Sequence, residues 1–142
     1  DYEFTSWSGD FTGTTNPLTV TNVTADTAIV ANFTSTILDH SASTLSVSSR
    51  RVNVGVANPS TITVQAKNDG VPASSGGKTV VLVEDGSATI SSVTDNGDGT
   101  YTATITNSTT EAVTISGTVG GDAIANTTTV TFTSGLITQY IP

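Results

Sequence analysis

Cysteine and methionine are absent from this sequence of 142 residues, and histidine and tryptophan each occur once. Without cysteine, the chain can form neither a disulfide framework nor a thiolate metal site. Lysine and arginine number 4 against 12 acidic residues, which gives a formal net charge of −8. Nucleic acids and anionic lipid surfaces both attract basic proteins, so these two classes of partner are disfavoured.

Long apolar runs are absent as well. No stretch approaches the roughly 20 apolar residues that cross a bilayer, so we expect no membrane insertion. Because the sequence opens directly on strand-like residues, we expect it to contain no signal peptide. We therefore expect it to be a mature or excised piece of a longer protein.

Threonine and β-branched apolar residues fill every segment of the chain, and these residue types favour β-strands. Apolar and polar residues alternate over residues 45–56, 62–66, 88–93, 101–105, 113–119 and 124–132. The unbroken apolar run at 79–83 suits a strand buried on both faces. Turns rich in Gly, Asn and Asp separate these segments. The pattern predicts an all-β protein, with an immunoglobulin-like sandwich of about seven antiparallel strands and a small additional N-terminal β module.

The composition changes along the chain and predicts four parts. Residues 1–34 form the partial N-terminal β module, and residues 35–42 form a linker. Residues 43–133 form the sandwich, and residues 134–142 form an apolar tail. Within the tail, a candidate assembly strand consists of Leu136, Ile137, Tyr140 and Ile141.

Four motifs in the sandwich region are characteristic of a known family. They are TLSVS (44–48), TITVQAKNDGVPASSGGKTVVL (61–82), GSATISSVTDNGDGTYTATITNS (86–108) and AVTISGTVGG followed by NTTTVTF (112–132). These motifs resemble the group 1 bacterial immunoglobulin-like domains of the invasin and intimin type. The resemblance implies a module that occurs in tandem rods on surface proteins and has no enzymatic activity.

The N-terminal region carries a second resemblance. YEFTSWSGDFTGTTNP (2–17) and LTVTNVTADTAIVANFT (18–34) contain an aromatic–Trp–Ser–Gly–Asp opening and a final Ala-x-Phe strand. This region resembles the C-terminal half of an internalin-type B-repeat, whose first half is missing. Because two or three strands alone rarely hold together in water, the fragment must pack on the sandwich or be completed by another chain.

Catalysis would need groups that titrate or attack, and the sequence offers few of them. His40, with Asp39 beside it, is the sole histidine available to a catalytic triad, and no nucleophile-elbow pattern accompanies it. We expect His40 to be a solvated linker residue. Glu84 and Asp85 would serve glycoside hydrolysis only across a cleft, and they fall in an expected turn. The sequence therefore predicts no enzyme.

The turn at residues 95–99 (Asp-Asn-Gly-Asp-Gly) has closely spaced oxygen ligands of the kind that calcium prefers. Asp95 and Asp98 are the candidate metal ligands, and they are also the second acidic pair. The glutamate that completes an EF-hand loop is missing, because Thr100 and Tyr101 begin a strand. We therefore expect a structural turn, with no metal and no cofactor.

Two kinds of carbohydrate chemistry are open. Trp7 is a candidate for stacking on a sugar ring, although the alternative is a small apolar core of Trp7, Tyr2, Phe4 and Phe33. Four asparagines lie in Asn-x-Ser/Thr sequons and are candidates for glycosylation: Asn22, Asn32, Asn107 and Asn126. Glycosylation is expected on exposed turns, such as the one at Asn107.

The function that fits best is a non-catalytic extracellular spacer, stalk or adhesion module of a microbial cell-surface protein. Its partners would be neighbouring domains, other subunits or a cell receptor. One alternative is a subunit of an extracellular filament or pilus, in which the apolar tail adds a strand to a neighbour. Another is a carbohydrate-binding accessory module with a glycan ligand.

Overall fold

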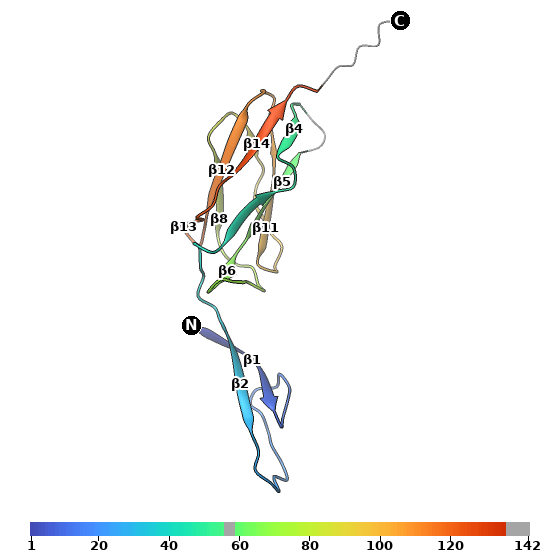
Figure 1. Cartoon of the computed structure of the whole chain (residues 1–142), viewed down its shortest axis with the longest axis vertical. Helices are drawn as coiled ribbons and strands as arrows, with labels where there is room; N and C mark the ends of the chain where they lie inside the picture. The colour runs from blue at the N-terminus through green and yellow to red at the C-terminus, as the bar shows by residue number, and fades with distance from the viewer. Residues whose placement is uncertain (56–58, 136–142) are drawn as a thin grey trace, which may run out of the picture. The chain divides into compact units, whose positions relative to one another are not determined.

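The computed structural model describes residues 1–55 and 59–135. Fourteen strands and no helix are present in this part of the chain (Figure 1), which confirms the all-β fold class. The chain divides into two compact units, Asp1–Ile37 and Leu38–Pro142. Val56, which was expected at the end of a strand, and the expected assembly strand at Leu136, Ile137, Tyr140 and Ile141 lie outside the described residues.

The first unit is a two-stranded antiparallel sheet of β1 (Tyr2–Gly9) and β2 (Ile29–Ser35). Asp10 closes the base of the loop between the strands. Its carboxylate accepts a bond from the Ala28 N–H, and its own N–H donates to the Ala28 carbonyl, both at 2.9 Å. Gly9 has a φ of 101°, and a Cβ there would collide with the same carbonyl oxygen. The Ser-Gly-Asp motif therefore fixes this turn through one glycine and one carboxylate.

Aromatic side chains gather on one face of this sheet. The Phe4 ring centroid lies 4.9 Å from that of Trp7 and 5.9 Å from that of Phe33. The predicted four-residue core is wrong in part, because Tyr2 is 68% exposed and Phe33 is 57% exposed. A two-stranded sheet has no second layer to cover the aromatic face, and no residue of this unit is fully buried.

The second unit contains two five-stranded sheets and a small hairpin. One sheet consists of β3 (Thr44–Val47), β5 (Ser60–Gln65), β9 (Thr89–Ile90), β10 (Thr94–Asp95) and β11 (Thr100–Thr106). The other consists of β4 (Arg51–Asn53), β8 (Val80–Glu84), β12 (Ala112–Val119), β13 (Asp122–Ala123) and β14 (Thr128–Thr133). The hairpin pairs β6 (Lys67–Asn68) with β7 (Val71–Pro72). Figure 1 shows the two sheets as layers of a sandwich, as predicted.

Alternation along the strands fills the space between the two sheets. In β11 and β12 every second residue is buried. The hydrophobic residues that are fully or almost fully buried are Leu45, Val52, Ile62, Val64, Ala66, Ala73, Tyr101, Ala103, Ile105, Val113, Ile115, Val119, Ile124, Val130 and Phe132. Removal of this apolar surface from water is the main force that stabilises the sandwich.

The alternate residues face outward, and most of them are threonine or serine. Across four neighbouring strands the register places Thr94 beside Thr102, Thr102 beside Thr63, and Thr63 beside Ser46. Such β-branched hydroxyl residues stabilise a solvated strand without presenting an apolar surface.

The segment at 79–83 contains a strand, but the burial of this strand differs from the prediction. β8 lies at the edge of its sheet and pairs with β12, and Val81 and Val83 are 50% and 53% exposed. The prediction that this run is buried on both faces is therefore wrong. The sandwich has only two layers, so one face of every strand points to solvent.

The last strand also differs from its expected start. Ile124 is 5% exposed, but it lies in the loop after β13, and β14 begins at Thr128. The Ile124 N–H donates to the Gly117 carbonyl at 2.9 Å, which turns its side chain into the core. The predicted turns at Asn68-Asp69-Gly70 and Gly120-Gly121 are confirmed, because Asp69, Gly70 and both latter glycines have positive φ.

Candidate functional site

The turn between β10 and β11 contains the two expected metal ligands. The Gly77 and Gly97 N–H groups donate to the Asp95 carboxylate at 2.6 and 2.9 Å. The Thr100 hydroxyl and N–H donate to Asp98 at 2.6 and 2.9 Å, the hydroxyl having the larger effect, and they lower the pKa of Asp98. No cluster of three His, Asp or Glu side chains suited to a metal occurs among the residues the structure describes. That this is a structural turn without a metal stays a prediction, with Asp95 and Asp98 as the candidate ligands.

The acidic pair at the end of β8 also accepts bonds from backbone groups. The Thr114 N–H donates to Asp85 at 2.7 Å, and this contact is the main cause of the lowered pKa of Asp85. Glu84 accepts a bond from the Gly86 N–H. The expectation that both residues lie in a turn is wrong for Glu84, which is the last residue of β8, while Asp85 lies in the bend that follows and is bonded to β12.

Glu111 was not singled out from the sequence, yet it organises the neighbouring loops. One of its carboxylate oxygens accepts bonds from the Ser87 hydroxyl at 2.6 Å, the Ser87 N–H at 2.8 Å and the Asn107 amide at 2.6 Å. These donors, Ser87 first, lower the pKa of Glu111. A lone glutamate in a polar turn gives no sequence signal for such a role.

A depression of about 300 Å³ lies next to this cluster. It is lined by Gly55, Ser87, Thr89, Thr106, Asn107 and Ser108. These residues supply hydroxyl, amide and backbone groups. Among the described residues of this lining, no side chain could act as a general acid or base near neutral pH.

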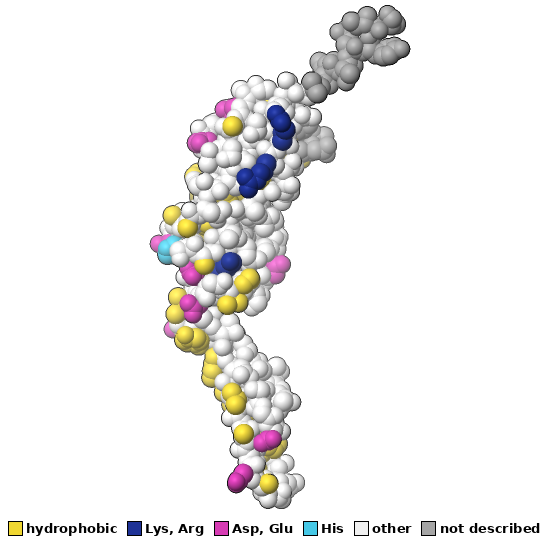
Figure 2. Space-filling view, in the orientation of Figure 1, with side chains coloured by type: hydrophobic (Ala, Val, Ile, Leu, Met, Phe, Trp, Pro, Cys, Tyr) yellow, Lys and Arg dark blue, Asp and Glu magenta, His cyan; other side chains and the backbone are white. Residues whose placement is uncertain are grey.

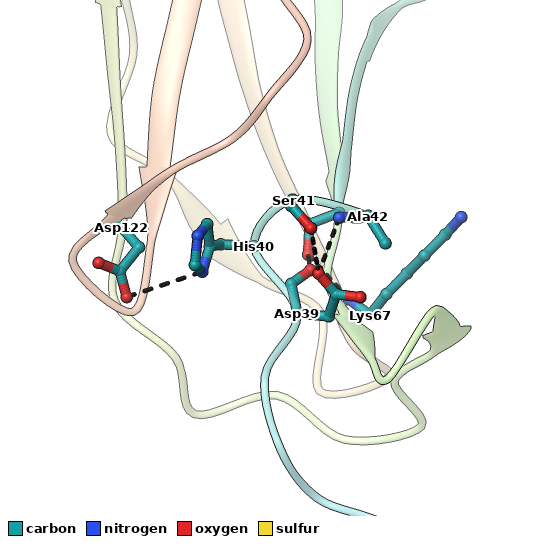
Figure 3. A network of polar contacts seen from close by, with 7 residues as sticks. Asp39, His40, Ser41, Ala42, Lys67 and Asp122 are labelled. Atoms are coloured by element: carbon teal, nitrogen blue, oxygen red, sulfur yellow. Dashed lines mark hydrogen bonds and ion pairs between the residues drawn. The ribbon is translucent and has the colours of Figure 1, made fainter.

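His40 lies at the opposite end of the sandwich, where the chain enters it. Its Nδ1 is 3.8 Å from Asp122 Oδ2, and the two side chains are 45% and 68% exposed (Figure 3). Asp39 turns away from His40, because its carboxylate accepts bonds from the Ser41 hydroxyl at 2.6 Å and the Ala42 N–H at 3.0 Å. The Ser41 hydroxyl is the main cause of the lowered pKa of Asp39. Asp39 therefore does not orient His40 as a catalytic aspartate would.

Residues 38–43, through which the chain enters the sandwich before β3, form the entry segment. This segment is bonded to the sandwich from its first residues. Leu38 forms a bridge with Asn68, and the Asp39 N–H donates to the Lys67 carbonyl at 2.7 Å. The Ser43 hydroxyl donates to the Asp39 carbonyl at 2.7 Å and accepts a bond from the Lys67 N–H at 3.0 Å. These contacts join the entry segment to β6.

The four sequons differ in how free their amides are. The Asn107 amide donates to Glu111, and the side chain is 5% exposed, so the expectation of an exposed turn there is wrong. The Asn32 amide donates to the hydroxyls of Ser6 and Ser8 at 3.1 and 3.0 Å, on the face of the first sheet opposite the aromatic residues. Asn22 is exposed in the long loop of the first unit, with a φ of 55°.

Asn126 uses its amide as a substitute for a backbone pair. Its Nδ2 donates to the Leu45 carbonyl at 2.7 Å, and its Oδ1 accepts from the Leu45 N–H at 2.9 Å. Both bonding groups of one β3 residue are therefore paired by a side chain from the loop before β14. Because the two residues are 81 positions apart, the sequence around either one does not indicate this contact.

Trp7 packs within its own sheet. Its ring lies against Phe4, and its Nε1 donates to the Thr15 carbonyl at 2.9 Å. A Trp7–Gly13 bridge holds the same loop beside β1. The ring is thus used to fix the loop, which leaves less of it for stacking on a sugar.

The charged groups form no concentrated patch on the face drawn in Figure 2, where they are scattered among uncharged polar side chains. Within residues 1–55 and 59–135, no helix is long and apolar enough to cross a membrane.

Several solved structures resemble the chain. Invasin, described as a bacterial integrin-binding protein, is 26% identical over 80% of this chain and 24% of its own, with a TM-score of 0.64. Yersinia pseudotuberculosis InvD is 30% identical over 82% of this chain and 36% of its own, with a TM-score of 0.63. The Escherichia coli adhesin FdeC is 28% identical over 78% of this chain and 36% of its own, with a TM-score of 0.60.

The chain therefore spans between about a quarter and a third of the length of these relatives. No curated protein sequence matches it significantly. The family profile described as invasin, domain 3, matches residues 39–135, which is most of the second unit. The chain therefore belongs to the invasin domain 3 family, the non-catalytic immunoglobulin-like modules found in bacterial cell-surface adhesins.

Proposed function

We propose that the chain serves as a spacer module, which holds a more distal binding domain away from the cell envelope. One observation carries the proposal. The second unit receives the chain at the end formed by β6 and β13 and releases it beyond β14, at the opposite end (Figure 1). A module with this connectivity adds its full length to a tandem array.

The surface of the sandwich supports the same use. Rows of threonine and serine cover the outer face of the β5–β11 sheet, and the carboxylates of the turns accept bonds from nearby donors. Such a surface is hydrated and carries a net negative charge, which keeps crowded modules soluble.

The test is to place the module between a membrane anchor and an adhesive tip on a bacterial surface and to measure adhesion. Deleting residues 38–135 should bury the tip among surface polymers and lower adhesion. Replacing them with an unrelated β-sandwich of equal length should restore adhesion. A failure of this replacement, together with direct binding of the purified chain to target cells, would show that the module is itself the adhesive part.

We propose further that residues 1–34 are the C-terminal half of an internalin-type B-repeat module, separate from the sandwich of residues 43–133. The support is the aromatic face of β1 and β2 and the Gly9–Asp10 turn that follows Trp7. Residues 35–42 then join the two, although Leu38 and Asp39 already bond to β6. Removing residues 1–34 should leave the thermal transition of the sandwich unchanged. A large loss of stability would mean that the two regions form one folding unit.

A further inference from the structure

β4 and β14 form the one parallel pair among the described strands. Their register places Thr131 beside Arg51, Phe132 beside Val52, and Thr133 beside Asn53. The ladder continues at both ends, because the Thr131 N–H donates to the Arg50 carbonyl at 2.8 Å and the Val54 N–H donates to the Thr133 carbonyl at 2.9 Å. β4 is therefore bonded to β14 along its whole length.

These two strands lie close to the two ends of the second unit. Only the entry segment and β3 precede β4, and β14 is the last described strand. Because the strands are parallel and the chain enters and leaves at opposite ends (Figure 1), tension pulls β4 and β14 in opposite directions along their own axes. The hydrogen bonds lie across the direction of pull and are loaded together. In a hairpin pulled from its open end, the bonds would instead break one after another.

Apart from the two side-chain bonds between Leu45 and Asn126, the other contacts near the entry are made to interior strands of the chain. The entry segment bonds to β6, and β3 pairs with β5, which is an interior strand of the chain. Releasing these contacts would leave β4 joined to β14. One face of the pair packs against the core, since Val52 is 7% exposed and Phe132 is 1% exposed. Water competes less well for hydrogen bonds that lie against a packed core.

We propose that the β4–β14 ladder is the mechanical clamp of this domain, the set of contacts that tension must break before the sandwich unfolds. The inference rests on the proposed function as a spacer, because only a module under tension uses such a clamp. Its test is made on the purified chain and does not depend on display at a cell surface. The force experiment can therefore refute the clamp while the adhesion experiment supports the spacer function. The adhesion experiment can likewise refute the spacer function while the force experiment supports the clamp.

The test uses a disulfide across the ladder in a chain that has no other cysteine. Asn53 and Thr133 are directly paired, and the Thr133 hydroxyl lies 3.5 Å from Asn53 Oδ1. In N53C/T133C, pulled from both ends by single-molecule force spectroscopy, the reduced form should unfold at the wild-type force. The oxidised form should lose that event. From the sandwich it should release only residues 38–52, a gain on the order of 50 Å at about 3.4 Å per residue, at lower force.

The proposal is overturned if the oxidised form still gives an event at the wild-type force with the shortened extension. The barrier would then lie in the entry segment or in β3. The reduced form of the same variant is the matched control, because it differs from the oxidised form by one covalent bond.

A second pair of variants tests the hydrogen bonds themselves. Val54→Pro removes the N–H that donates to Thr133, and Ser91→Pro removes one that donates to the Thr104 carbonyl at 2.9 Å, away from both ends. At constant force, Val54→Pro should unfold about tenfold faster, which corresponds to about 1.4 kcal/mol in the barrier. Ser91→Pro should change the rate less. Equal acceleration by both variants would argue against a clamp at β4 and β14.

Discussion

Two glycines of the turn at 95–99 provide a matched test of the packing between loops. Gly97 has a φ of 80° and Gly99 a φ of 84°, so replacing either by alanine forces a side chain into the left-handed region. A Cβ on Gly97 would meet nothing within 4 Å, whereas a Cβ on Gly99 would overlap the Ala73 carbonyl and side chain. Both substitutions therefore carry the same free-energy cost in the backbone, but only Gly99→Ala adds a steric collision.

The backbone cost is about 1–2 kcal/mol, and it is partly offset because alanine restricts the unfolded chain. Gly97→Ala should therefore lower the free energy of unfolding by about 1 kcal/mol. Gly99→Ala must also displace Ala73, which is 8% exposed and whose N–H donates to the Ala66 carbonyl at 2.9 Å. It must move Gly99 as well, whose carbonyl accepts from the Ala66 N–H at 2.9 Å. We expect a further loss of at least ~2 kcal/mol from these displaced contacts.

Urea denaturation followed by circular dichroism, with thermal melting beside it, measures the difference. A further 2 kcal/mol should lower Tm by about 8–16 °C in a domain of this size. The denaturant slopes of the two variants should agree, because both unfold the same surface. Equal stabilities for Gly97→Ala and Gly99→Ala would refute the reasoning, since they would show that the contact with Ala73 carries no cost.

Three other outcomes follow from the side-chain contacts. In a host that attaches N-linked glycans to folded proteins, peptide mass spectrometry should find the glycan at Asn22 and not at the other three sequons, whose amides are bonded; occupancy at Asn107 would contradict this. The pKa of Glu111 is held below its ordinary value of 4.5, so its contribution to stability is present above that pH and is lost as the pH falls through the folded pKa. When the free energy of unfolding is measured as the pH is lowered, Glu111→Gln should therefore lose less stability than the wild type. Identical pH profiles for the two proteins would exclude the effect. Glycan arrays should show no binding by the wild type or by Trp7→Ala, because the Trp7 ring and N–H are engaged by Phe4 and Thr15; binding that disappears only in Trp7→Ala would restore the sugar-binding hypothesis.

The sequence predicts much of the sandwich because its information is local. Alternation with a period of two sends Tyr101, Ala103 and Ile105 to the core and their neighbours to solvent, as the structure has them. Glycine and aspartate mark the turns, because few other residues adopt positive φ. The residues that face inward and the turns between the strands are thus predictable from the sequence alone.

What the sequence does not predict depends on partners that are distant along the chain. The run that contains Val81 and Val83 has no alternation, and only its pairing with β12 makes β8 an edge strand with one solvated face. The same holds for the contacts of Glu111, which come from loops 4 and 24 positions away. Three of the four sequon amides, those of Asn32, Asn107 and Asn126, are likewise bonded to groups that the sequon pattern does not reveal.

The Asn126 amide has a consequence for arrays of similar modules. The amide bonds both the N–H and the carbonyl of Leu45 in β3, which is an edge strand of its sheet. A strand from another chain could otherwise pair with these backbone groups. Neighbours in a tethered array meet at very high local concentration, and exchange of strands between them is a common route to misassembly. A single carboxamide thus protects each copy from its neighbours while they fold side by side.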